Sequence, residues 1–454
     1  MKAFDLKPTL DNLITTFKKD TIKRNADIFR FTEILDAIED SCSIALDGNW
    51  GSGKTFFVKQ VKMVMDAHNN HMIFEDEENR KEIIQICKRH YKIEKSLEPQ
   101  VSVYYDAWMN DNDDDPILSL VYTILNDVNT DFSFRDTDSL KLGAAIIEFF
   151  SGKNWYNIID TLRGSSPLDA LSNQKEIEKT IGEFLDSLIV EKGKRLIIFI
   201  DELDRCKPNY AVHLLERIKH YFSHDMVTFV FSVNTNELQH TIKQYYGSGF
   251  DGSKYLNRFF DLKICIPPID TQAYYRTLDF NDRYYTYDLV CGAVIKAFRF
   301  ELRDIAKYLR MTKIAAYKQT HSTASLAFSD GGALGFCLFS IIPVMIGLML
   351  HDMRRYTDFI TGKDYTPLIE VNEYLNNRVF FDLLDPSETF DPKEKDKAVV
   401  TVENKIKAVY EAIFITEYSG NMYQTTIGGL VFYANLKNDL LRITGLLSDF
   451  SNYD

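Results

Sequence analysis

A glycine-rich stretch between two apolar runs carries the clearest chemical signal in this sequence. GNWGSGKT at residues 48–55 fits the pattern G-x-x-x-x-G-K-[ST]. Glycines allow backbone N–H groups to curl around a phosphate chain, and the helix that follows directs its positive end at the same anion. The alternative is a chance glycine turn, which a strand before and a helix after the motif disfavour. We therefore predict a phosphate-binding loop.

Two residues of this loop have predicted roles in chemistry. Lys54 is expected to reach the β- and γ-phosphates, and Thr55 is expected to bind Mg²⁺. The predicted cofactors are therefore a nucleoside triphosphate and Mg²⁺. No guanine-reading N/TKxD block follows the apolar run at 227–234, which agrees with adenine and hence with ATP. The full set of predicted nucleotide-binding residues is Gly48, Trp50, Gly51, Ser52, Gly53, Lys54, Thr55 and Phe56.

A second motif, RLIIFIDELDRC at residues 195–206, is an apolar run followed by two acidic residues, Asp201 and Glu202. Ligands of open α/β sheets bind at the carboxyl ends of such strands. We predict that Asp201 holds Mg²⁺ through water and that Glu202 is the general base for the attacking water. The alternative is that both carboxylates cap the next helix.

Three further polar residues are candidates for the same reaction. Asn234 follows the apolar run VTFVFSV and could orient the lytic water, although a simple Asx turn would place an asparagine there as well. Arg258 and Arg303 could each offer charge to the γ-phosphate, from the same chain or from a neighbour. The alternative for both arginines is a solvated surface position.

Five short apolar runs must position these residues. They are rich in Val, Ile, Phe and Tyr, as is typical of strands buried on both faces of a parallel sheet, and helical patterns alternate with them. We predict an α/β fold: a P-loop NTPase core with a central, mostly parallel sheet, followed by a helical lid and a helical C-terminal region. The five runs are residues 43–47, 101–108, 195–201, 227–234 and 262–268.

The apolar runs of the strand type stop after Pro268, where we place a domain boundary. The predicted domains are a nucleotide-binding core over 1–268, a helical lid over 269–360 and a helical region of unknown role over 361–454. Within the core, residues 110–190 form a long insert between the two phosphate-related motifs.

An uncharged stretch at residues 331–350, GGALGFCLFSIIPVMIGLML, is long enough to cross a bilayer. The alternative is a buried helix or helix pair, broken near Pro343, inside a helical domain. We favour burial because the stretch is isolated and contains proline and glycines. Membrane association therefore stays a secondary hypothesis.

Composition limits the function further. The chain of 454 residues carries a net charge of −13, which argues against broad nucleic-acid binding. Its six cysteines form no CxxC pair, so neither a zinc site nor a disulfide framework is indicated. The start of the chain has no apolar signal-peptide region, and a cytoplasmic location is expected.

Taken together, these motifs resemble the KAP family of P-loop NTPases. DELDRCKP (201–208) resembles the extended Walker B signature of the family, YYDAWMNDNDDDP (104–116) its A-W block, and LRDIAKYLR (302–310) the block of its helical lid. The similarity covers roughly residues 20–315. Asp106 stands where the family often has Asn, and Glu202 stands where many members have Asp.

The resemblance implies an additional-strand ATPase core related to AAA+ and STAND switches, with Asp204 and Arg205 near the nucleotide or a subunit interface. Many members insert membrane helices between the two Walker motifs; here the apolar run at 142–150 is too short to span. The resemblance further implies a molecular switch, in bacterial anti-phage defence, working as a homo-oligomer or with a partner effector subunit. The alternatives are a nucleotide-stabilised scaffold with little hydrolysis and a nucleic-acid motor.

Overall fold

The fold is seen in a computed structural model of the chain. Two compact units divide it, Lys7–Ile269 and Asp270–Asp454. The residues that the structure describes are 7–72, 74, 76–91, 97–113, 115–128, 146, 174–278, 285–316, 328–375, 379, 395–416 and 424–445.

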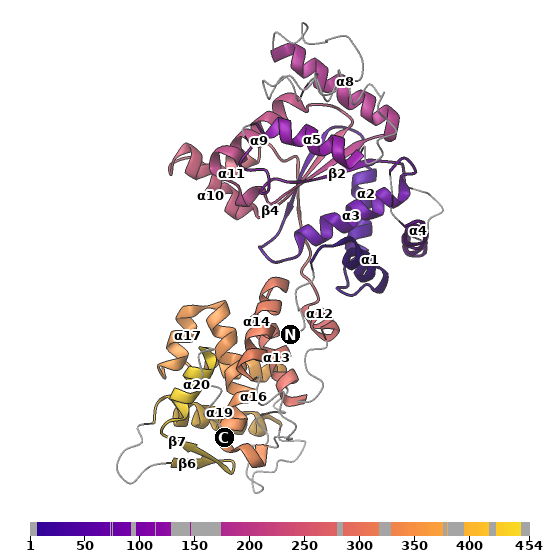
Figure 1. The fold of residues 1–454 in the computed structure, drawn as a ribbon. Coiled ribbons are helices and arrows are strands. Elements are labelled where there is room, and N and C mark those ends of the chain that lie inside the picture. The colour runs from indigo at the N-terminus through magenta and orange to yellow at the C-terminus, as the bar shows by residue number, and fades with distance from the viewer. Residues whose placement is uncertain are drawn as a thin grey trace. The chain divides into compact units, whose positions relative to one another are not determined.

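The first unit is built on a five-stranded parallel sheet with the strand order β2-β3-β4-β1-β5 (Figure 1). β3 and β4 are buried along their whole lengths, as their continuous apolar sequences require. The strands are β1 (Cys42–Asp47), β2 (Val101–Asp106), β3 (Leu196–Asp201), β4 (Val227–Val233) and β5 (Leu262–Cys265). All five predicted strands are confirmed, and with them the α/β fold class.

Helices cover both faces of this sheet. Neighbouring residues of a strand point to opposite faces: on one face the ammonium of Lys59, from α3, lies 4.3 Å from the ring centre of Tyr104, and on the other the hydroxyl of Tyr105 lies 2.6 Å from that of Ser119, in α5. The helices of this unit are α1 (Leu10–Lys19), α2 (Asn25–Asp36), α3 (Lys54–His68), α4 (Glu77–Tyr91), α5 (Pro116–Val128), α8 (Gln174–Lys192), the 3₁₀ turn η3 (Leu203–Arg205), α9 (Pro208–Tyr221), α10 (Thr235–Tyr246) and α11 (Gly252–Leu256).

The sheet has two distinct edges. Asp47, Asp106 and Asp201 end their strands at one edge, which we call the carboxyl edge. Cys42 and Val227 begin their strands at the opposite one, the amino edge. The predicted insert at 110–190 enters the described structure as α5 and α8, whereas the apolar run at 142–150 lies, except for Ile146, outside the described residues.

The second unit is mostly helical. Its helices are α12 (Thr271–Thr277), α13 (Tyr285–Ala297), α14 (Leu302–Ala315), α16 (Phe328–His351), α17 (Met353–Ile360), α18 (Thr366–Leu375), α19 (Lys395–Phe414) and α20 (Leu436–Thr444). α13 packs against α18, and α16 packs against α20. The boundary predicted near residue 360 therefore runs between helices that pack on one another.

A β-hairpin in this unit departs from the expectation that strands stop after Pro268. β6 (Gln424–Ile427) pairs antiparallel with β7 (Leu430–Tyr433) across Gly428 and Gly429. A two-residue Gly-Gly connection is a standard hairpin turn, so the sequence carried a signal that the overall helical pattern of the region masked.

The uncharged stretch lies in α16. Among the described residues, one helix, Gly332–His351, is long and apolar enough to cross a membrane, and 83% of its most apolar window is buried inside the protein. The predicted break near Pro343 is wrong: the helix continues through this residue, and the non-helical backbone is at Gly332.

Candidate nucleotide site

The glycine-rich loop connects β1 to α3 at the carboxyl edge. Gly51 and Gly53 have φ angles of 85° and 82°, in the left-handed region that side chains disfavour. Gly53 is also the N-cap of α3, so the helix begins at Lys54 with its unpaired N–H groups facing the loop. This is the strand, loop and helix that the motif requires.

The side chain of Lys54 folds back over this loop. Its ammonium donates to the carbonyl oxygens of Gly48 and Asn49 at 2.6 and 3.1 Å. Burial lowers the pKa of Lys54, while the carboxylates of Asp204 and Asp201 act in the opposite direction. The loop lysine therefore lies within the electrostatic influence of two of the three acidic residues of the second motif, Asp201 and Asp204.

Asp201 lies at the end of β3 and is almost fully buried, with 1% of its surface exposed. The hydroxyl of Tyr104, on β2, donates to its Oδ2 at 2.9 Å. Burial and the charge of Asp201 both raise the pKa of Tyr104, which keeps this hydroxyl protonated as a donor. Asp106 and Ser232 are its partners in register on the flanking strands, so all three side chains share a face of the sheet.

Glu202 follows in a left-handed conformation, with φ of 59°. Its carboxylate pairs with the guanidinium of Arg205 at 2.7 Å, and this guanidinium in turn lies 5.4 Å from the ring centre of Trp108. Burial raises the pKa of Glu202, and Arg205 opposes that shift. The residue predicted to be the general base is thus engaged in an ion pair.

A direct hydrogen bond joins the two motifs. The indole Nε1 of Trp50, in the loop, donates to Oδ2 of Asp204 at 2.6 Å, although the two residues are 154 positions apart. Burial raises the pKa of Asp204, and the hydrogen bond from Trp50 and the charge of Lys54 oppose the shift. Asp204 therefore contacts the glycine-rich loop.

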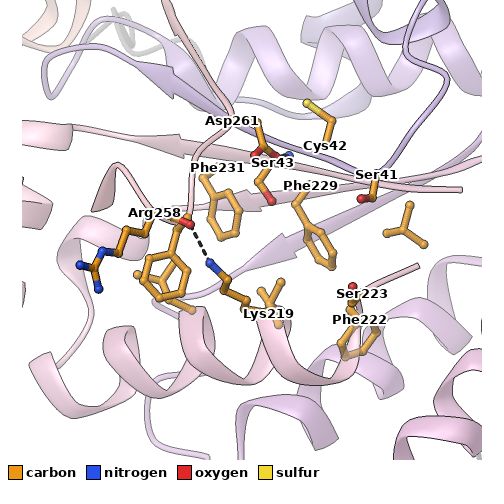
Figure 2. Close-up of a pocket in the computed structure, with 14 residues that line it drawn as sticks. Ser41, Cys42, Ser43, Lys219, Phe222, Ser223, Phe229, Phe231, Arg258 and Asp261 are labelled. Carbon is orange, nitrogen blue, oxygen red and sulfur yellow. Dashed lines mark hydrogen bonds between the residues drawn. The ribbon is translucent and has the colours of Figure 1, made fainter. Parts of the chain in front are cut away.

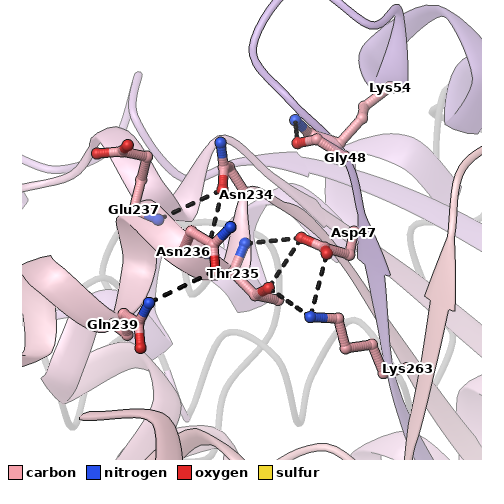
Figure 3. A network of polar contacts seen from close by, with 9 residues as sticks. All are labelled: Asp47, Gly48, Lys54, Asn234, Thr235, Asn236, Glu237, Gln239 and Lys263. Carbon is pink, nitrogen blue, oxygen red and sulfur yellow. Dashed lines mark hydrogen bonds and ion pairs between the residues drawn. The ribbon is translucent and has the colours of Figure 1, made fainter.

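A polar network surrounds the end of β1 (Figure 3). Asp47 accepts the backbone N–H and the hydroxyl of Thr235 at 2.8 and 2.9 Å, and it pairs with Lys263 at 3.1 Å. Asn234 is the N-cap of α10, and its side-chain oxygen accepts the N–H groups of Asn236 and Glu237. This oxygen therefore makes the local cap that was the alternative to a water-orienting role.

The two candidate arginines are not brought to Lys54 within the first unit. Arg258 is exposed, between α11 and β5 at the amino edge, opposite the edge that holds the loop. Nearby, the carboxylate of Asp261 accepts a hydrogen bond from the N–H of Ser43 at 2.8 Å. Arg303 is exposed in the first turn of α14, in the second unit.

Three residues at the site were missed by the sequence reasoning. Tyr104 contacts Asp201, Ser232 lies beside it, and Arg24 donates to the carbonyl of Ser52 at 3.0 Å. The alternation in VSVYYD places Tyr104 on the same face as Asp106, so that residue could have been found. The other two contacts depend on strand order and on a separate N-terminal helix, for which the sequence has no local signal.

The oxygen groups at this edge suit Mg²⁺ bound together with phosphates. Magnesium in such sites uses one or two protein oxygens and completes its shell with water and substrate, which fits Thr55 and the buried Asp201. In the part of the chain that is described, the hydroxyl oxygens of Ser52 and Ser232 are buried without a hydrogen-bond partner. No group of three or more His, Cys, Asp or Glu side chains in that part could hold a metal alone.

Comparison with known proteins decides the family. Residues 24–283, more than half of the chain, match the KAP family P-loop domain. The chain belongs to the KAP family of P-loop NTPases. An uncharacterized protein of Methanocaldococcus jannaschii is 47% identical to this KAP protein over 49 residues, 11% of this chain and 25% of that protein, so the match spans a quarter of the relative's length.

Among solved structures, the Orc1 protein of Aeropyrum pernix in complex with DNA superposes with a TM-score of 0.32 and 12% identity, covering 94% of this chain and 93% of that one. Membership of the family implies nucleotide binding, and the family is one of NTPases.

Proposed function

We propose that this KAP protein binds ATP with Mg²⁺ at the carboxyl edge, hydrolyses it, and uses the cycle as a molecular switch. One observation carries the proposal: the indole Nε1 of Trp50, in the glycine-rich loop that carries Lys54, donates to Oδ2 of Asp204 in the second motif at 2.6 Å, so the loop and the acidic motif meet at one edge of the sheet. Opposed positive and negative groups at the end of a parallel sheet are what a magnesium-bound triphosphate needs.

Each residue has one task in this proposal. Lys54 exchanges the loop carbonyls for phosphate oxygens, which are stronger acceptors because they are charged. Thr55 and Asp201 hold Mg²⁺, which when bound offsets the negative charge of the phosphates. Glu202 accepts a proton from the attacking water. Tyr104 keeps the Asp201 carboxylate oriented.

The ion pair between Glu202 and Arg205 supports a switch. A carboxylate held by a guanidinium at 2.7 Å is a weaker base than a free one, and it is turned to its partner rather than to water. Hydrolysis then requires this pair to open. The same pair is also the observation that favours the second candidate, a nucleotide-stabilised scaffold with little turnover.

We propose further that the protein works in the cytoplasm as a homo-oligomer or with a partner effector subunit, in anti-phage defence. The support for defence is the resemblance of the motifs alone. A plaque assay in a bacterial host, comparing cells with the wild-type gene and with Lys54→Ala, tests it: equal plating efficiency would remove the defence role while leaving the ATPase proposal intact.

Phosphate release from ATP by the purified protein separates the switch from the scaffold. We expect Mg²⁺-dependent turnover in the wild type and a loss of roughly 10²–10⁴-fold in Glu202→Gln, because the amide keeps the shape and cannot accept the proton. Glu202→Gln should still bind ATP. Binding without release in the wild type would favour the scaffold, and unchanged turnover in Glu202→Gln would show that another group is the base.

A further inference from the structure

Arg24 is a buried arginine that stands outside both phosphate-related motifs. It is the N-cap of α2, with 2% of its surface exposed. The turn that precedes it contains two residues in the left-handed region, Asp20 at φ 45° and Lys23 at φ 55°. Non-glycine residues keep such a backbone only where surrounding contacts hold it, and here Asn25 donates to the side chain of Asp20 and to the carbonyl of Phe17.

The guanidinium of Arg24 bridges two distant segments. Nη1 donates to the carbonyl oxygen of Ser52, in the glycine-rich loop, at 3.0 Å. Nη2 donates to the carbonyl oxygen of Pro267 at 2.5 Å. Pro267 follows β5 and lies three residues before Asp270, where the second unit begins. One side chain thus joins the loop to the segment that leaves the first unit.

Backbone packing reinforces this bridge. The N–H of Ile266 donates to the carbonyl of Asp47 at 2.8 Å. A Cβ built on Gly48 would lie 2.4 Å from Cγ2 of Ile266, which no real contact allows. The connecting segment, residues 266–269, is therefore pressed against the first residue of the loop and bonded through Arg24 to its fifth.

The contact with Ser52 also has a direction. A trans peptide points its C=O and the N–H of the next residue to opposite sides. When Arg24 binds the carbonyl of Ser52, the N–H of Gly53 must point away from Arg24, and Gly53 has the left-handed backbone that such loops need to turn N–H groups toward an anion.

We propose that Arg24 is a positioning residue that fixes the Ser52–Gly53 peptide for phosphate binding and ties this loop, through Pro267, to the segment entering the helical unit. The proposal rests on the proposed function, since nucleotide must bind in the loop before the contacts of Arg24 can carry its effect to the connecting segment. A planar fork can hold two carbonyls at fixed positions at once, whereas a lysine ammonium is a single point charge.

The test compares Arg24→Lys and Arg24→Met in the full chain with Arg30→Met, a matched control on the exposed side of α2. We expect ATP affinity to fall at least about tenfold in Arg24→Met, as for the loss of a charged hydrogen bond. In hydrogen exchange, Mg²⁺–ATP should protect residues 48–55 and the connecting segment in the wild type and in Arg30→Met. The connecting segment is read at the amides of Ile266 and Ile269, because Pro267 and Pro268 have no N–H. In Arg24→Lys, protection of the loop should survive and protection of the connecting segment should be lost.

Two outcomes would overturn the proposal. In the first, Arg24→Lys has the same ATP affinity and the same protection of the connecting segment as Arg30→Met. In the second, Arg24→Lys only lowers the stability of the whole protein, and native-state exchange is unchanged at the loop and at the connecting segment. A comparison without nucleotide separates this proposal from the proposed function. If the wild type binds no ATP, the function fails. Faster exchange at the connecting segment in the nucleotide-free Arg24→Lys protein would still support the tie, and unchanged exchange there would refute it.

Discussion

The two edges of the central sheet are built from the same strands and differ in what they bury. At the carboxyl edge, Asp201 is 1% exposed and Lys54 is 9% exposed, within the reach of each other's charge. The hydroxyl of Ser52 is buried there without a partner. Buried polar groups of this kind destabilise a protein unless something satisfies them, so this edge is shaped for a polar ligand.

The amino edge holds a cavity lined by both apolar and polar side chains. A cavity of about 130 Å³ opens between α9 and the sheet, and phenyl rings form much of its wall (Figure 2). The polar groups beside it are bonded to backbone: Lys219 donates to the carbonyl of Arg258 at 2.8 Å, and Asp261 accepts the N–H of Ser43. The difference teaches that a cavity whose lysine and aspartate are already bonded to backbone is a poorer candidate for a phosphate site than an edge with buried charged groups.

The largest expected effect is on ATP binding, and it is tested by replacing one lysine at each edge of the sheet. Lys54→Ala should remove ATP binding, because the buried ammonium is the charge that we propose binds the phosphates, while Lys219→Ala at the amino edge should bind as the wild type does. Isothermal titration with Mg²⁺–ATP measures both. Equal affinity in the two variants would erase the distinction between the edges.

Arg258 is the residue through which the amino edge could take part in hydrolysis. Figure 2 shows its guanidinium pointing away from Phe229 and Phe231, and the residue is exposed. Supplied to a neighbour's site, it should contribute about 10³-fold to turnover, so Arg258→Ala should lose activity and retain ATP binding.

Mixing Arg258→Ala with Lys54→Ala chains should restore part of that activity, since an intact loop can then meet an intact arginine. Arg30→Ala serves as the control for loss of an exposed arginine. No rescue, together with specific activity that does not depend on protein concentration, would leave the amino edge without a part in the reaction.

A smaller effect is expected from Arg205→Met. Arg205 lowers the pKa of Glu202 against the effect of burial, so its removal should raise that pKa further. Glu202 must be ionised to accept a proton, and the acid limb of the kcat–pH profile should therefore move to higher pH. Above that limb, kcat should rise several-fold as the ion pair is lost. A limb that stays in place, or moves to lower pH, would contradict the base assignment.

The smallest effect concerns the network at the end of β1. Burial raises the pKa of Asp47, but hydrogen bonds from Thr235 and Lys263 outweigh it and lower the pKa overall. The ionised carboxylate thus stabilises the fold above its ordinary pKa, and this contribution disappears as pH falls through the lowered value.

Asp47→Asn should accordingly reduce the free energy of unfolding by up to about 1 kcal/mol at neutral pH, in keeping with a partly exposed pair. Urea unfolding at neutral and acidic pH measures the difference, with Lys263→Met as the companion variant. If Asp47→Asn still has the lower free energy of unfolding at acidic pH, the stabilisation comes from the packing of the Asp47 side chain rather than from its charge.

The sequence revealed the parts of this site that depend on local order. Continuous apolar runs predicted the five strands, and the end of one of these runs correctly placed Asp201 at the carboxyl edge. Contacts between segments far apart in the chain were beyond local patterns. The bond from Trp50 to Asp204 and the bridge by Arg24 depend on how β1, β3 and α2 come together, which no short spacing encodes. Arg258 was a candidate because it is an arginine, but its location at the amino edge depends on the direction of β5, which the sequence does not show.

The most direct test of the central claim is a crystal structure with a non-hydrolysable ATP analogue and Mg²⁺. We expect the triphosphate in the loop 48–55, with the ammonium of Lys54 moved from the carbonyls of Gly48 and Asn49 to phosphate oxygens, and the metal beside Asp201. An analogue bound in the phenylalanine-lined cavity at the amino edge, or bound anywhere with Lys54 still on the loop carbonyls, would contradict the account.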